Sequence, residues 1–421
     1  MSATGVAVGV ARELRAICGE RFVAENARPN NVAGFDVSPA SAEEAAAVLT
    51  IANEHELSVA PSGGFTELDP SVLRVDIVLH TDRLTQVEHY DHADLTVGVG
   101  AGMTIARLSA MVGADRLLFG CDPPSPERAT VGGILATGGH GPLRHGYGAP
   151  RDYCIGVRFV TGDGRRAKGG GRVVKNVAGY DLMKLLIGSY GTLAIMTSAS
   201  FKLFPAPRQT RTYLAEFATA REALEFRDRI MRSPLSPMCL ELVSPGARKL
   251  MRPDVTSDAW VICVRAAGSD AILARYCKEL GSAVTHELYG DGELKMWKAI
   301  EDFPASQTGQ GDQAQIVELT VWPRDVQAVV DSLLETSALG GPDVGIIGRV
   351  GIGHLVVKSC GGIDAGRAIA EVLTKNLRGK VTVKAAGAAN PWPIPPENLA
   401  SMRAVKQALD PKNVLRGREI F

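Results

Sequence analysis

Glycine-rich segments set between apolar runs constrain this chain more than any other feature. Residues 129–141 read ATVGGILATGGHG, residues 185–195 read LLIGSYGTLAI, and Gly63 and Gly64 follow the apolar residues 57–60. Glycine loses more conformational freedom on folding than any other residue, so it is expected where a side chain would clash or φ must be positive. The pattern therefore predicts backbone that passes close to something flat or anionic, such as a large cofactor held mostly by main-chain atoms.

Length, charge and cysteine usage limit the class of protein. A chain of 421 residues is too long for one compact core and predicts two domains. Lys+Arg and Asp+Glu balance at 46 each, which argues against nucleic acid as the main partner. The 7 cysteines show no CxxC spacing, so we expect reduced thiols and no metal or iron–sulfur site held by this chain alone. Neither a leader peptide nor a run of about 18 apolar residues stands out, which predicts a cytoplasmic protein without a transmembrane segment.

Periodicity in the first half predicts many short strands among a few helices, which is an α+β arrangement. Ser41 and Glu44 form a capping box ahead of a helix whose apolar face carries Ala45, Val48, Leu49 and Ala52. Other helices are expected at Gly5–Cys18, Thr104–Met111 and Asp181–Ile187. Expected strands are Leu57–Ala60, Val75–Leu79, Leu84–His89, Leu95–Val99, Val173–Val174, Leu193–Met196, Ser200–Leu203 and a hairpin of Ile155–Val160 with Arg165–Lys168.

Gly98, Gly100 and Gly102 lie between a predicted strand and a predicted helix, which raises the question of a dinucleotide fingerprint. That fingerprint would need glycine at position 103, where Met103 stands, and no acidic residue follows at the usual distance. We therefore interpret the three glycines as a structural turn.

The glycine clusters belong to longer segments: PSGGFTELD (61–69), ATVGGILATGGHG, YGAPRD (147–152) and GGRVVKNVAGYDLMKLLIGSYGTLAIMTSASFKLFP (170–205). In this order and spacing they resemble the FAD-binding, PCMH-type domain of the vanillyl-alcohol oxidase superfamily. Within it they most resemble the FAD-binding E subunit of glycolate oxidase. The resemblance implies two α+β subdomains that bind FAD over residues 37–206 and a smaller α/β cap domain over 207–390. A helical segment (1–36) precedes them, and a linker with a C-terminal return to the FAD domain (391–421) follows.

The resemblance also assigns cofactor contacts. The pyrophosphate is expected at the loop of Ser62, Gly63, Gly64, Phe65 and Thr66. The ribityl chain and isoalloxazine are expected at Pro123, Thr130, Gly132, Gly133, Thr137 and Gly141, with Tyr147, Gly148 and Asp152 as continuation, and the adenosine end at Ile195. Read from the residues alone, Ile195 could equally be core and Asp152 a structural cap.

Departures from the family pattern shape the expected binding. Phe65 stands where some superfamily members carry the histidine that bonds covalently to flavin, so we expect non-covalent FAD. Glu67 and Tyr190 also differ from the usual residues and change the loop's shape and charge. Near the C-terminus, residues 415–418 lack the Asn and Pro found in relatives.

The second half predicts a sheet covered by helices. Helices are expected at Ala220–Ser233, Asp270–Leu280, Glu293–Glu301, Asp325–Leu334 and Gly366–Leu373. Strands are expected at Cys239–Val243, Trp260–Arg265, Val317–Trp322, Val344–Val350 and His354–Lys358. Relatives that oxidise 2-hydroxy acids carry two histidines and an acid for a metal in this cap, whereas this chain has Arg349 and His354 there. A lone histidine is not a metal site. No catalytic residue is assigned. Arg349 could hold a substrate carboxylate or form a structural ion pair. His354 is expected to be a core or interface residue, and His140 is a candidate for lying near the flavin.

Three functions remain open at this point. The first is an FAD-binding subunit of a complex that oxidises a small 2-hydroxy acid of the glycolate or lactate type. Its partners would be a sister FAD-binding oxidase subunit and an iron–sulfur subunit, which could bring it to the inner membrane as a peripheral protein. The second is a stand-alone FAD-dependent dehydrogenase of another alcohol or hydroxy acid. The third is a degenerate flavin domain that acts as an assembly scaffold.

Overall fold

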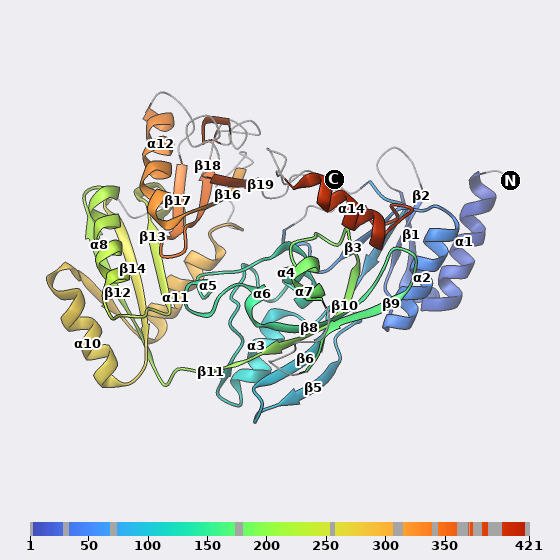
Figure 1. The fold of residues 1–421 in the computed structure, drawn as a ribbon, viewed down its shortest axis with the longest axis horizontal. Helices are drawn as coiled ribbons and strands as arrows, with labels where there is room; N and C mark the ends of the chain where they lie inside the picture. The colour runs from blue at the N-terminus through green and yellow to red at the C-terminus, as the bar shows by residue number, and fades with distance from the viewer. Residues whose placement is uncertain are drawn as a thin grey trace. The chain divides into compact units, whose positions relative to one another are not determined.

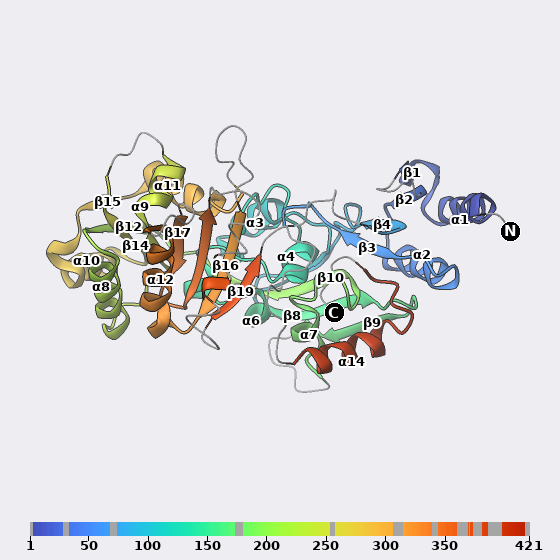
Figure 2. The same cartoon turned by 90° about the horizontal axis from the view of Figure 1, so that it is seen from above.

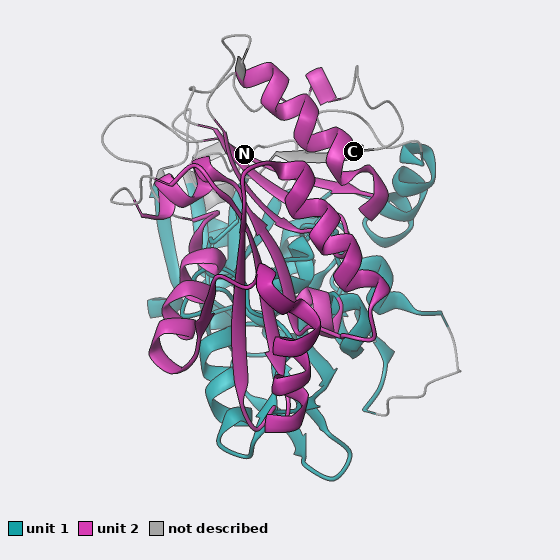
Figure 3. Cartoon of the chain, turned by 90° about the vertical axis from the view of Figure 1, so that its left-hand side faces the viewer, with its two compact units in different colours: residues 1–140, 149–206, 395–421 teal, residues 141–148, 207–394 magenta. Residues whose placement is uncertain are grey.

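The computed structural model describes residues 3–27, 33–67, 74–172, 180–252, 257–305, 315–338, 344–359, 369, 371–373, 381–385 and 398–416. Several features named from the sequence lie outside these residues. They are the expected strand at Val173–Val174, Cys360, the 391–396 linker and most of the expected helix 366–373. The chain forms two compact units (Figure 3). Unit 1 comprises residues 1–140, 149–206 and 395–421, and unit 2 comprises residues 141–148 and 207–394. The fold is α+β, with several sheets and mixed helices.

Unit 1 begins with a four-stranded sheet covered by two helices. The strand order is β1 (Val23–Ala27), β2 (Ala33–Val37), β4 (Ile77–His80) and β3 (Val59–Ser62), and β4 runs parallel to both β2 and β3. The helices α1 (Ala3–Cys18) and α2 (Ala42–Glu54) bury their apolar faces on this core (Figure 1). Ser41 caps α2 by accepting a hydrogen bond from the backbone N–H of Glu44, as predicted. The Glu44 carboxylate accepts one from the backbone N–H of Ala40.

A five-stranded antiparallel sheet forms the second layer of unit 1. Its order is β5 (Val87–Asp91), β6 (Thr96–Gly100), β10 (Ile195–Lys202), β8 (Cys154–Val160) and β9 (Arg166–Gly170). Helices α3 (Ile105–Gly113), α4 (Val131–Thr137), α6 (Pro150–Tyr153) and α7 (Leu182–Leu186) contribute to the core on one face. The predicted hairpin is confirmed as β8 and β9. The prediction of two strands at 193–196 and 200–203 is wrong: one strand, β10, runs through both. It pairs with β6 in regular register and with β8 through two register shifts. Thr197 and Ser198 interrupt the apolar residues in the sequence, but both are buried within the strand at 2% exposure.

The rejected dinucleotide fingerprint has a structural explanation in unit 1. A Cβ on Gly100 would lie 2.1 Å from the carbonyl oxygen of Leu84, and one on Gly102 would lie 1.8 Å from that of Thr81. These glycines therefore allow protein backbone to pack on protein backbone.

Two smaller elements complete unit 1. Strands β7 (Leu117–Leu118) and β11 (Phe204–Pro205) pair with each other. The C-terminal helix α14 (Leu399–Leu409) returns to unit 1, and the bridge between Leu415 and Val59 joins the end of the chain to β3 (Figure 2).

Unit 2 is built on one eight-stranded antiparallel sheet. Its order is β15 (His286–Leu288), β12 (Thr210–Phe217), β14 (Trp260–Ala267), β13 (Cys239–Val243), β17 (Val344–Arg349), β18 (His354–Ser359), β16 (Gln315–Val321) and β19 (Val381–Ala385). Helices α8 (Ala220–Arg232), α10 (Asp270–Leu280) and α12 (Val326–Ala338) bury apolar side chains on the sheet. The described residues of unit 2 also include the helices α5 (Arg144–Tyr147), α9 (Pro245–Met251) and α11 (Gly290–Asp302).

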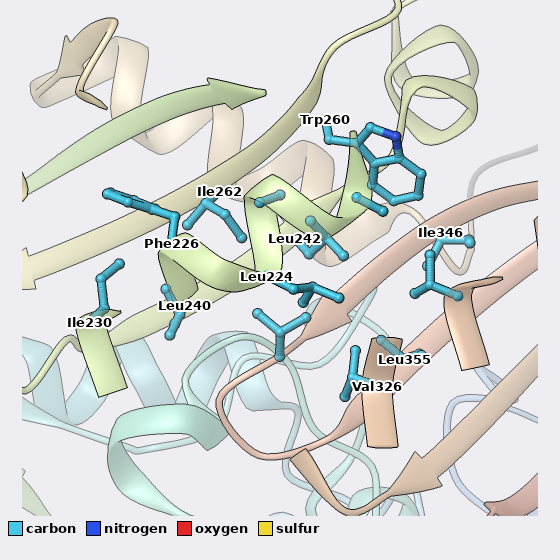
Figure 4. Packing of buried hydrophobic residues seen from close by; sticks show 14 of the residues in the cluster. Leu224, Phe226, Ile230, Leu240, Leu242, Trp260, Ile262, Val326, Ile346 and Leu355 are labelled. Carbon is cyan, nitrogen blue, oxygen red and sulfur yellow. The ribbon is translucent and has the colours of Figure 1, made fainter. Parts of the chain in front are cut away.

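The core of unit 2 explains why its helices are amphipathic. Leu224 and Phe226 of α8 point toward Leu242 and Ile262 of the sheet, and Val326 of α12 joins the same cluster (Figure 4). Burying one such side chain stabilises the fold by about 1.5–3 kcal/mol. The predicted helices at 220–233 and 270–280 and the predicted strand at 239–243 are confirmed. Strand β12 and the short helix α9 were not predicted.

Within the described residues, no helix is both long enough and apolar enough to cross a lipid bilayer.

Candidate functional site

The loop after β3 is the first wall of the candidate site. The carbonyl oxygen of Ser62 accepts hydrogen bonds from the backbone N–H and the hydroxyl of Thr81, at 2.9 and 3.1 Å, so the loop starts from a fixed point. A Cβ on Gly63 would lie 2.2 Å from Oγ1 of Thr130, and one on Gly64 would lie 1.8 Å from the carbonyl oxygen of Arg128. The glycines are therefore required by contact with the 128–130 segment.

Backbone donors in this loop have no acceptors. Among the described residues, no acceptor is present for the backbone N–H groups of Gly63, Gly64, Phe65 and Thr66. Gly63, Gly64 and Phe65 are partly buried and Thr66 is exposed. Consecutive N–H groups that no protein acceptor occupies are a feature of anion-binding loops. Phe65 also has φ 49°, a left-handed conformation that is uncommon for a non-glycine residue and concentrates at functional sites.

The glycine-rich helix α4 and the turn before β10 form the other walls. Thr130 caps α4 by accepting a hydrogen bond from the N–H of Gly133, and the hydroxyl of Thr137 donates to the carbonyl oxygen of Gly133 at 3.0 Å. In the 188–194 turn, the N–H of Tyr190 donates to the carbonyl oxygen of Ala136 at 2.7 Å. Tyr190 has φ 53°, so two left-handed non-glycine residues face one pocket.

These walls enclose a pocket of about 90 Å³ within unit 1. Its unpaired N–H groups suit an anion such as a pyrophosphate. It is lined by residues 61–67, Thr81, Thr130, Gly132, Gly133, Ala136, Thr137, Tyr190, Gly191 and residues 194–196.

The structure brings together most, though not all, of the residues that the resemblance assigned to FAD. Those lining the pocket are Ser62, Gly63, Gly64, Phe65, Thr66, Thr130, Gly132, Gly133, Thr137 and Ile195. Pro123, His140 and Asp152 belong to unit 1 but do not line it, and Asp152 accepts a hydrogen bond from the N–H of Ala149 at 2.7 Å as a cap of α6. Gly141, Tyr147 and Gly148 belong to unit 2.

Several lining residues were not singled out from the sequence. Gly191 lies in the glycine-rich turn and could have been found: its φ is 71°, and a Cβ there would lie 2.2 Å from Cγ of Pro61. The pocket is also lined by Thr81, Ala136, Ala194 and Met196. These residues belong to no motif that the sequence shows, and only the folding of distant segments against one another brings them to the pocket.

The two candidate residues of the cap lie in a buried polar cluster of unit 2. The guanidinium of Arg349 donates from Nε to the carbonyl oxygen of Gly141 at 2.8 Å. Its Nη1 lies 3.0 Å from Nδ1 of His354, and its Nε lies 3.5 Å from Oε1 of Glu241. Arg349 is thus bonded to protein groups and forms a structural ion pair with Glu241. The side chain of His354 is buried, at 3% exposure.

Burial sets the ionisation of this cluster. Desolvation raises the pKa of Glu241 to about 7, although the attraction of Arg349 opposes it. Desolvation lowers the pKa of His354 to about 4, against the effect of a hydrogen bond with Glu318. His354 is therefore neutral at pH 7, and its Nδ1 can accept a hydrogen bond from Arg349. Both oxygens of Glu241 lack a hydrogen-bond donor among the described residues.

Comparison with known families gives matches to both halves of the chain. The family model for the FAD binding domain matches residues 34–170, and the one for the C-terminal domain of FAD linked oxidases matches residues 206–418. The glycolate oxidase subunit GlcD of Bacillus subtilis is 26% identical over 91% of this chain and 88% of its own length.

Two other curated relatives match over shorter lengths. A D-lactate dehydrogenase of Archaeoglobus fulgidus is 36% identical over 53% of this chain and 50% of its own length. The glycolate oxidase subunit GlcE of Escherichia coli is 35% identical over 36% of this chain and 44% of its own length. The matched part thus spans half or less of these two proteins.

Solved structures show the same fold at low sequence identity. A p-cresol methylhydroxylase with substrate bound superimposes with a TM-score of 0.76 at 16% identity, covering 99% of this chain and 97% of that one. An alkyldihydroxyacetonephosphate synthase gives a TM-score of 0.74 at 18% identity, covering 97% and 86%.

Proposed function

The chain belongs to the FAD linked oxidases, and on that basis we propose that it is the FAD-binding part of an enzyme that oxidises small 2-hydroxy acids. An FAD-dependent oxidoreductase activity follows from the family itself. The names of the curated relatives, D-lactate dehydrogenase and two glycolate oxidase subunits, support a 2-hydroxy acid as the substrate.

The observation that carries the proposal is the loop of unpaired N–H groups at the end of β3. The residues there fit FAD: backbone donors of Gly63, Gly64, Phe65 and Thr66 would bind the pyrophosphate, and all four residues line the pocket. Thr130 and Thr137 would line its flank, and Ile195 would meet the adenosine end. When bound, FAD supplies the acceptor for the electrons that leave the substrate alcohol. The protein would bind FAD without a covalent bond, since Phe65 offers no nucleophile.

We further propose that this chain works as one subunit of a complex. Two relatives are named as subunits of glycolate oxidase, which supports partner subunits for this chain. A sister flavoprotein and an iron–sulfur protein are the partners that the family resemblance implies. The cap of this chain supports the same division of labour. Arg349 and His354 are buried and bonded to protein groups, so neither is available in this arrangement to bind a substrate carboxylate.

The first test is the absorbance spectrum of the purified chain before and after acid precipitation. We expect a flavin band that moves to the supernatant, and a band that stays in the pellet would show a covalent bond. Neither bound flavin nor uptake of added FAD would overturn the proposal in favour of a scaffold.

The second test separates a subunit from a stand-alone enzyme. Anaerobic glycolate or D-lactate should bleach the flavin in the complex isolated through a tag on this chain, whereas acetate, which lacks the hydroxyl, should not. The isolated chain should be bleached slowly or not at all. Turnover by the isolated chain at ordinary enzymic rates, about 1–1000 per second, would contradict the subunit role and favour a self-sufficient dehydrogenase.

A further inference from the structure

The five-stranded sheet of unit 1 has a second face that the FAD pocket does not use. Side chains alternate along each strand, and Val97, Phe159 and Phe201 point to the face that carries the helices. On the opposite face, pairing places four small residues in one row across neighbouring strands. Gly98 pairs with Ser200, Ser200 with Gly156, and Gly156 with Gly170. Since this row has almost no side chains, it leaves a depression in the sheet.

The depression is a cavity of about 260 Å³. Beyond the cavity, the His89 ring covers Gly98 in the same row, where an added Cβ would be 2.3 Å from the ring atoms Cε1 and Nδ1. At one end of the cavity the backbone of Gly171 lies over Gly156, where an added Cβ would be 2.5 Å from the Gly171 carbonyl oxygen. The cavity shares no lining residue with the candidate FAD pocket.

The cavity lining carries an excess of positive charge. Three cations, Arg158, Lys168 and Arg172, line it together with one carboxylate, Glu88. Glu88 pairs with Arg158 at 3.4 Å, whereas Lys168 and Arg172 have no carboxylate partner among the described residues. Three positive charges and one negative charge leave a net charge of +2. Two unpaired cations on one concave surface are suited to an anion with two charges.

Hydrogen-bonding groups are also available at this cavity. The hydroxyls of Ser198 and Ser200 lie on the cavity floor. His89 lies next to the lining residues and is not one of them: it pairs with Gly98, which in turn pairs with the lining residue Ser200. Its ring can therefore report on the cavity without being a ligand.

We propose that this cavity binds a compact dianion, either a phosphate or a small dicarboxylate, between the side chains of Lys168 and Arg172 and over Ser198 and Ser200. Both ligand types present two negative charges and several acceptor oxygens. The proposal does not depend on the substrate of the flavin.

The test uses the full chain and two probes, inorganic phosphate and succinate, each compared with chloride at equal ionic strength. Binding is followed by calorimetry and by the NMR signal of the His89 ring, which lies beside the lining residue Ser200. Since phosphate could also occupy the FAD loop, the titrations are repeated in a Gly64→Ala background. We expect one of the two probes to shift the His89 signal saturably in both backgrounds, and the probe that does so identifies the ligand type.

Matched variants locate the site. Lys168→Ala and Arg172→Ala should each weaken binding at least about tenfold, which is the usual range for losing one charge-assisted hydrogen bond. Arg166→Ala is the control: it removes the same charge from β9, but Arg166 does not line the cavity and pairs with Glu43. It should change the affinity less than about twofold. Ser200→Leu should block binding because the larger side chain fills the cavity while all the charged residues remain. If Ser200→Leu fails to fold, Lys168→Ala and Arg172→Ala decide the test.

A His89 signal that does not saturate with either probe, or that shifts equally in chloride, would overturn the proposal. Equal weakening by Arg166→Ala and Lys168→Ala would do the same, because it would show general electrostatic attraction.

Discussion

Arg349 and Glu241 form an ion pair in which neither side chain reaches solvent. Nε of Arg349 lies 3.5 Å from Oε1 of Glu241, and the two side chains are 5% and 0% exposed. The same Nε donates a hydrogen bond to the carbonyl oxygen of Gly141. The pair therefore fastens segment 141–148, which enters unit 2 from the glycine-rich part of unit 1, onto strands β13 and β17.

Arg349→Met should destabilise unit 2 strongly. It leaves the Glu241 carboxyl buried without a cation and removes the donor to Gly141, and breaking one side of a buried pair costs about 3–5 kcal/mol. The double variant Arg349→Met with Glu241→Leu should recover much of that loss, since it removes both charges. The midpoint of thermal unfolding and the urea transition measure both effects. A double variant no more stable than Arg349→Met would show that the bond to Gly141, rather than the charge, dominates.

Glu241 should make the stability of unit 2 fall as pH rises. Its pKa is about 7 in the folded chain and near 4.5 when unfolded, so between these values the folded state binds more protons and loses stability with rising pH. His354 acts in the opposite sense. Its pKa is about 4 in the folded chain and 6.5 when unfolded, so the stability of the folded state rises with pH between these two values.

Glu241→Gln removes only the first of these contributions. Relative to wild type, its free energy of unfolding should rise by on the order of 2–3 kcal/mol between pH 4.5 and 7. Urea unfolding at several pH values measures this difference. A constant offset between the two proteins across the window would contradict the raised pKa.

Gly64→Ala should abolish or greatly weaken FAD binding. The added Cβ would lie 1.8 Å from the carbonyl oxygen of Arg128, so the loop must move and its N–H groups are displaced from the pocket wall. The ratio of flavin to protein absorbance after gel filtration measures the effect. Gly113→Ala is the control, because a Cβ there meets nothing within 4 Å; it should retain FAD and gain up to about 1 kcal/mol. Full flavin content in Gly64→Ala would remove the loop from the cofactor site.

The sequence predicted those parts of the structure that depend on local pattern. Ser41 indicates the start of a helix through its capping side chain, and the sequence of residues 220–233 indicates a helix directly. Both helices are confirmed. The glycine loop at 63–64 was also predicted, because close contact with another segment requires glycine, and the glycines are visible in the sequence.

Features that depend on distant parts of the chain were not predictable. Nothing in residues 141–148 indicates that they group with unit 2, because the contacts are with distant parts of the chain. Gly146 packs on the backbone of Met238, and Arg349 donates its hydrogen bond to Gly141 from more than 200 positions later. Likewise, the depression beside His89 exists only because strand pairing aligns Gly98, Ser200 and Gly156, which are far apart in sequence.

Lys406 should be required both for stability and for tight FAD binding. Its buried ammonium pairs with Asp410 and donates to the carbonyl oxygens of Thr192 and Leu415, each at 2.8 Å. Thr192 follows Gly191, a lining residue of the candidate FAD pocket, so this one side chain joins the C-terminal helix to a wall of the pocket.

Lys406→Met should cost about 3–5 kcal/mol, because Asp410 stays buried with only the N–H groups of Val414 and Leu415 to stabilise its charge. It should also weaken FAD binding, since the turn at 190–192 loses its anchor. Thermal unfolding and FAD titration of the apoprotein measure the two effects separately. Lys412→Met is the matched control: this exposed lysine donates to the carbonyl oxygen of Asn53, so both quantities should change little. If Lys406→Met loses stability but binds FAD as tightly as wild type, the anchor stabilises α14 alone and the turn keeps its shape without it.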